Sequence, residues 1–91
     1  MIFITTYKTK PYMTKEETSE LMALFAEVGN APGTIAHYVA ADASSGVVIA
    51  EVDDITETYS NLLNYEPYIE FDSKVMLRVE DAVPLLMDFL S

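Results

Sequence analysis

Residues 34–52 read TIAHYVAADASSGVVIAEV, and this stretch is the most informative about the fold. Two runs rich in β-branched and aromatic residues, 34–43 and 47–52, flank a turn of small polar residues at 44–46. Such runs favour strands, and a connection this short joins two strands as a hairpin. The sequence therefore predicts an antiparallel hairpin in the middle of the chain.

Helices are predicted on both sides of this hairpin. Thr14 and Glu17 have the spacing of a capping box, and apolar residues then recur at helical spacing. Gly29 supplies the left-handed residue that commonly ends a helix. A second helix follows the hairpin and is capped by Asp53 or Asp54, because a side-chain oxygen there accepts from the first free amides.

The outer segments complete the pattern. Residues 2–8 read as a strand, and residues 68–79 read as one interrupted strand or two short ones. Residues 80–90 form a final helix that is so apolar that we expect it to dock on another surface. The order β-α-β-β-α-β-α predicts a ferredoxin-like α+β fold, with a four-stranded antiparallel sheet and helices on one face. Residues 1–91 are expected to form a single domain.

Composition indicates a partner chain and excludes some classes of ligand. A chain of 91 residues buries a modest core, 51% of its residues are hydrophobic, and it has no cysteine for a disulfide. Association with a second copy is the usual remaining source of stability. Fifteen acidic residues against five basic ones give a net charge of −10, which argues against binding to nucleic acid or to anionic membranes. The N-terminus lacks a basic, apolar leader, so a cytoplasmic location is expected.

Four segments carry a resemblance to a known group of proteins. They are the opening strand 2–7, the hairpin end 48–54, Tyr59, and the late strand 75–81. Together they resemble the dimeric α+β-barrel proteins, which include antibiotic-biosynthesis monooxygenases and muconolactone-isomerase-like proteins. The closest resemblance is to a small bacterial family of unknown function. This resemblance implies a homodimer in which the sheet faces away from the helices pack together as a barrel.

Three residues are candidates for catalysis. His37 is the sole histidine and lies in a predicted strand, so it points either into the core or into an interface, as a general base or as a structural residue. Glu51 lies in an apolar strand and is either an acid–base group or an interface carboxylate. Arg78 is the sole arginine and either binds a ligand carboxylate or forms an ion pair with a nearby acid. Whether His37 and Glu51 share a sheet face depends on the hairpin register.

Three tyrosines are candidates for ligand binding. Tyr7, Tyr38 and Tyr59 are predicted to line one cavity between the sheet and the second helix, unless they simply fill the core. One histidine and no cysteine make a transition-metal site unconvincing, and no cofactor motif is present.

Two functions remain open on this sequence. The first is a homodimer that binds a small apolar or aromatic ligand or serves as an interaction module. The alternative is a cofactor-independent isomerase, cyclase or monooxygenase-like enzyme acting on a small hydrophobic substrate. The enzyme requires at least two of His37, Glu51 and Arg78 within hydrogen-bond reach around a cavity.

Overall fold

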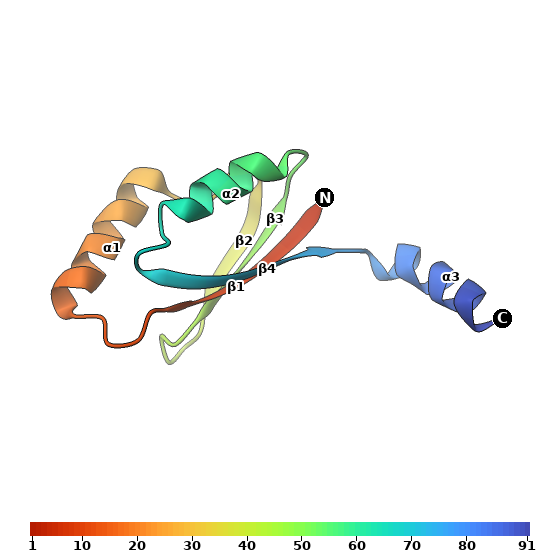
Figure 1. The fold of residues 1–91 in the computed structure, drawn as a ribbon, viewed down its shortest axis with the longest axis horizontal. Coiled ribbons are helices and arrows are strands. Elements are labelled where there is room, and N and C mark those ends of the chain that lie inside the picture. Colours follow the sequence, from red (N-terminus) through yellow and green to blue (C-terminus); the bar gives the residue numbers. More distant parts are fainter.

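The computed structural model of the chain describes residues 1–91 and follows the predicted order of elements. The strands are β1 (Ile2–Thr9), β2 (Thr34–Val39), β3 (Gly46–Glu51) and β4 (Ile69–Met76), and the helices are α1 (Lys15–Val28), α2 (Ile55–Leu63) and α3 (Val79–Leu90). The strands form one antiparallel sheet in the order β2-β3-β1-β4, and α1 and α2 lie over the same face of it (Figure 1). The α+β, ferredoxin-like architecture predicted from the sequence is therefore confirmed.

The helices begin where their capping residues predict. The Thr14 hydroxyl accepts from the Glu17 amide at 3.0 Å, and the Glu17 carboxylate accepts from the Thr14 amide at 3.3 Å. Gly29 ends α1 with φ +74°. Of the two aspartates proposed for α2, Asp54 is the cap, and it accepts from the Thr56 amide at 2.9 Å. Hydrogen bonds from Thr56 lower the pKa of Asp54, because they favour the charged carboxylate.

The hairpin turn is longer than predicted, because β2 ends at Val39 rather than at residue 43. Asp42 accepts from both the amide and the hydroxyl of Ser44, at 3.1 and 2.7 Å, so its side chain supports a turn in place of a strand. Hydrogen bonds from the same groups lower the pKa of Asp42. Ala43 adopts φ +63° within this turn, which a strand does not allow.

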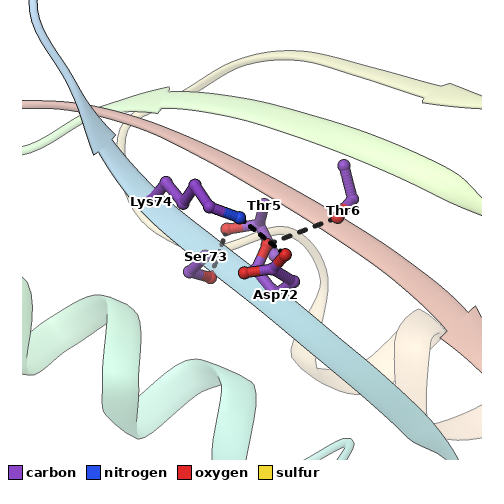
Figure 2. A network of polar contacts seen from close by, with 5 residues as sticks. All are labelled: Thr5, Thr6, Asp72, Ser73 and Lys74. Carbon is purple, nitrogen blue, oxygen red and sulfur yellow. Dashed lines mark hydrogen bonds and ion pairs between the residues drawn. The ribbon is translucent and has the colours of Figure 1, made fainter.

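The last strand is continuous, so the prediction of one interrupted strand or two short ones is wrong in both of its forms. β4 pairs with β1 along its length, and the break expected at Asp72 and Ser73 lies inside the strand. Figure 2 shows the side chains along this seam: the Ser73 and Thr5 hydroxyls lie 2.7 Å apart, and Lys74 contacts Asp72 at 2.7 Å. Of these two contacts, only the one between Thr5 and Ser73 joins β1 to β4, because Asp72 and Lys74 both belong to β4.

The two sides of the sheet differ in what covers them. The helix-facing side carries the buried Phe3 and Ala50, which contribute to a core completed by Leu21, Val52 and Tyr65. Side chains alternate between the two sides of a strand, so the other side, which we call the open face, presents an apolar cluster. The open-face cluster consists of Ile2, Ile4, Ala36, Val47 and Ile49. No part of the chain covers it (Figure 1).

The final helix extends away from the sheet. α3 continues outward from the end of β4 and has no buried residue (Figure 1). The expectation that this helix docks is therefore not met within its own chain, and Phe89 is 83% exposed. None of the helices is both long enough and apolar enough to cross a membrane.

Candidate functional site

An apolar cavity of about 620 Å³ lies between the helix-facing side of the sheet and helices α1 and α2. Its floor comes from strand residues, and its walls come from Leu21, Met22 and Phe25 of α1 and Leu62 of α2. The strand residues that line it are Tyr7, Thr9, His37, Val39, Ile69 and Phe71. Small-molecule sites typically enclose roughly 300–1,000 Å³, with mostly apolar walls and a few polar groups. The cavity has the size and character of such a site.

One chain of hydrogen bonds joins three polar residues that line this cavity. The Tyr7 hydroxyl lies 2.6 Å from His37 Nε2, and His37 Nδ1 lies 2.8 Å from Asn30 Oδ1. Tyr7 comes from β1 and His37 from β2, while Asn30 follows the glycine that ends α1. We call Tyr7, His37 and Asn30 the relay.

Aromatic packing holds the histidine ring in place. The Tyr7 and His37 rings meet edge to face with centroids 5.5 Å apart, and Phe25 approaches His37 in the same manner at 6.0 Å. Edge-to-face contacts are a preferred arrangement of aromatic rings. Burial raises the pKa of the Tyr7 phenol, because removal from water disfavours the phenolate. Tyr7 therefore keeps its proton across the neutral range.

Gly46 makes room for the Tyr7 ring. A Cβ atom at residue 46 would collide with Tyr7 Cζ, so the ring occupies the space of the missing side chain. The pairing of Tyr7 with Gly46 in the β1–β3 register places them opposite each other. A close approach, rather than turn geometry, is the reason for glycine here.

We expect Gly46→Ala to displace the Tyr7 ring and destabilise the protein by about 1–3 kcal/mol, as overpacked positions do. Urea unfolding measures the loss. The control is the same substitution in a Tyr7→Ala background, where the added methyl group meets no ring and the loss is expected to disappear. An equal loss in both backgrounds would contradict the contact between Gly46 and Tyr7.

Of the residues proposed from the sequence, His37 and Tyr7 lie together at the cavity. The register pairs His37 with Val48 and Ile2 with Glu51, so Glu51 lies on the open face, on the opposite side of the sheet from His37. Tyr38 also lies on the open face, 63% exposed. The prediction that Tyr7, Tyr38 and Tyr59 line one cavity is therefore wrong for two of the three, since Tyr59 is 68% exposed and does not line the cavity either.

Arg78 lies outside the strand in which it was predicted. β4 ends at Met76, and Arg78 occupies the N-cap position of α3 without a capping hydrogen bond. It forms no ion pair, and the nearby acids Glu70 and Asp72 contact Lys8 and Lys74 instead. Only His37 of the three catalytic candidates lines the cavity. The requirement set for an enzyme, two of the three within reach of each other, is not met.

Sequence reasoning missed Asn30, Phe25 and Gly46 as parts of this site. Asn30 and Gly46 were assigned to a helix end and a turn, and Phe25 to an apolar stripe. Their roles depend on which strand residues face the helices, and no local pattern carries that information. No three His, Cys, Asp or Glu side chains gather into a group that could hold a metal ion.

Comparisons with known proteins identify the family. No curated protein matches the chain. Among solved structures, Rv0793 from Mycobacterium tuberculosis is similar, with 14% identity and a TM-score of 0.45 over 85% of this chain and 94% of that one. PA3566 from Pseudomonas aeruginosa is similar, with 16% identity and a TM-score of 0.44 over 85% of this chain and 93% of that one. A family model described as "Domain of unknown function (DUF3303)" matches residues 1–90, and the chain belongs to this family.

Proposed function

We propose that this protein is a homodimer that binds a small apolar or aromatic ligand in the cavity between its sheet and its helices. The observation that carries the proposal is the cavity itself, about 620 Å³ of largely apolar space with the relay in its lining. In an ordinary protein core, side chains fill the interior and leave few voids larger than a water molecule. An unfilled space of this volume is typical of a small-molecule site. The proposal keeps the cytoplasmic location expected from the sequence.

The surface area of the chain supports the homodimer. Its solvent-accessible surface is 6777 Å², whereas a compact monomer of this mass exposes roughly 5,300 Å². Its radius of gyration is 16.0 Å, against roughly 12 Å for a compact domain of this length. The excess area, roughly 1,500 Å², exceeds the roughly 800 Å² per partner that a standard interface buries.

Two apolar surfaces of the chain are uncovered. The first is the open-face cluster, and the second is α3, whose exposed apolar residues include Leu85, Leu86 and Phe89. A second copy of the chain carries the same two apolar surfaces. In a two-fold symmetric dimer, the apolar surfaces of each copy can therefore pack against those of the other. We therefore propose a second copy of this chain as the partner.

Ligand binding predicts a rise in the unfolding temperature. A ligand at ten times its dissociation constant adds about 1.4 kcal/mol of stability, which raises Tm by several degrees in a domain of this size. We expect such a rise with naphthalene or indole, measured by thermal unfolding of the native protein.

A matched pair of variants locates the binding site. Leu62→Trp fills the cavity from α2 and is expected to abolish the rise, whereas Leu63→Trp adds the same ring at a neighbouring, half-exposed position outside the cavity and is expected to keep it. The proposal fails if no apolar compound raises Tm in the native protein, or if Leu62→Trp leaves the rise intact.

A further inference from the structure

Asn30, the last residue of the relay, determines which atom donates in each of its hydrogen bonds. Asn30 Oδ1 is a carbonyl oxygen and can only accept, so His37 Nδ1 carries the proton that it receives. A neutral imidazole then has Nε2 as an acceptor. The Tyr7 hydroxyl, 2.6 Å from Nε2, must therefore donate its proton to the histidine.

Because the Tyr7 hydroxyl donates to His37, Tyr7 can only accept a hydrogen bond from a ligand. Its proton points to His37, and no other hydrogen bond joins its oxygen, so the oxygen is free to accept. The neighbouring cavity walls are aromatic or aliphatic: Phe25, Phe71 and Leu21. The cavity therefore presents a hydrogen-bond acceptor inside apolar surroundings, with the raised pKa of Tyr7 keeping the phenol neutral.

We infer that the ligand of this cavity is an apolar compound bearing one hydroxyl group, which donates a hydrogen bond to the Tyr7 oxygen. The inference rests on the proposed function and narrows its ligand class. The ligand hydroxyl, Tyr7, His37 and Asn30 would then form a chain in which every donor has an acceptor and the bonds reinforce one another. A ligand with an ether oxygen at the same place would set two acceptors against each other, and neither oxygen would gain a donor.

A matched pair of ligands tests this direction. We would measure the binding of 2-naphthol and 2-methoxynaphthalene to the native protein by calorimetry at neutral pH. The two probes share a ring system and differ in whether the oxygen can donate. We expect 2-naphthol to bind about tenfold more tightly, because the ether leaves the partly buried Tyr7 oxygen without a donor.

Variants assign the preference to the relay. Tyr7→Phe removes the phenol oxygen but frees His37 Nε2 as an acceptor, so the test combines it with His37→Leu. The double variant lacks both acceptors and is expected to bring the two dissociation constants within about twofold of each other. Tyr38→Phe removes a tyrosine hydroxyl on the open face and is expected to leave the preference unchanged.

The outcomes separate this inference from the proposed function. Equal binding of the two probes to the native protein, or tighter binding of the ether, overturns the inference while leaving the cavity as a ligand site. Failure of both probes and of naphthalene to bind overturns the proposed function as well. The comparison in the native protein decides the matter even if the double variant does not fold.

Discussion

Ile49→Asp is expected to convert the proposed dimer into monomers. Ile49 pairs with Ile4 at the centre of the open-face cluster, where the proposed partner packs. A carboxylate there would be buried without a cation, because Lys74, two strands away on the same face, already contacts Asp72. Burying an unpaired charge costs several kcal/mol, so the dissociation constant should rise by roughly 100-fold or more.

Sedimentation equilibrium at micromolar concentration measures this change. Tyr59→Asp is the matched control, because it places the same charge on an exposed apolar residue of α2, away from both the open face and α3. The control is expected to remain dimeric. A native protein that sediments as a monomer, or an Ile49→Asp variant that dimerises as well as the native protein, would contradict the proposed interface.

Gly33→Ala is expected to destabilise the fold by about 3 kcal/mol or more, because two costs add: a left-handed backbone and a collision with main-chain atoms. Gly33 has φ +80°, and a Cβ there would collide with the Glu51 carbonyl oxygen. The Glu51 amide donates to the Gly33 carbonyl at 3.0 Å, so the collision falls on the contact that joins the start of β2 to the end of β3. Backbone atoms have little freedom to move aside, and His37 lies on the strand that would shift.

Gly29→Ala provides the control for this experiment. Gly29 has nearly the same φ, +74°, but no atom lies within 4 Å of the position that a Cβ would take, so the substitution carries the backbone cost alone. We expect a loss of roughly 1–3 kcal/mol at Gly29, because φ +74° with ψ −163° is a conformation that residues other than glycine rarely adopt. Chemical denaturation measures the free energy of unfolding of both variants. Equal losses would show that the close contact between Gly33 and the Glu51 carbonyl does not add to the cost of Gly33→Ala.

The local features of the fold could be predicted because each depends on neighbours in the sequence. The capping box at Thr14, the helix stop at Gly29 and the cap at Asp54 all act within a few residues, and all three appear in the structure. The order of strands and helices followed from the same local patterns. The turn after Val39 was predicted too short, because the hydrogen bonds of Asp42 outweigh the strand tendency of the residues around it.

The site was harder to predict because it depends on register. A shift of one residue moves a side chain to the opposite side of the sheet, and the hairpin sequence allows either choice. His37 faces the helices and Glu51 the open face because of the pairing of His37 with Val48. Arg78 was misplaced for a different reason: the strand ends two residues before it, and strand ends depend on tertiary contacts that a local pattern does not contain.

Ligands are expected to bind between the sheet and the helices rather than on the uncovered open face, and both the proposed ligand site and the proposed ligand class depend on this location. Methyl-resolved NMR during a titration with 2-naphthol distinguishes the two surfaces, because they carry different methyl groups. We expect concentration-dependent shifts at Leu21, Leu62 and Ile69, which line the cavity, with Ile4 and Ile49 of the open face unchanged. Shifts confined to Ile4 and Ile49, or no shifts at all, would show that the cavity is not the binding site.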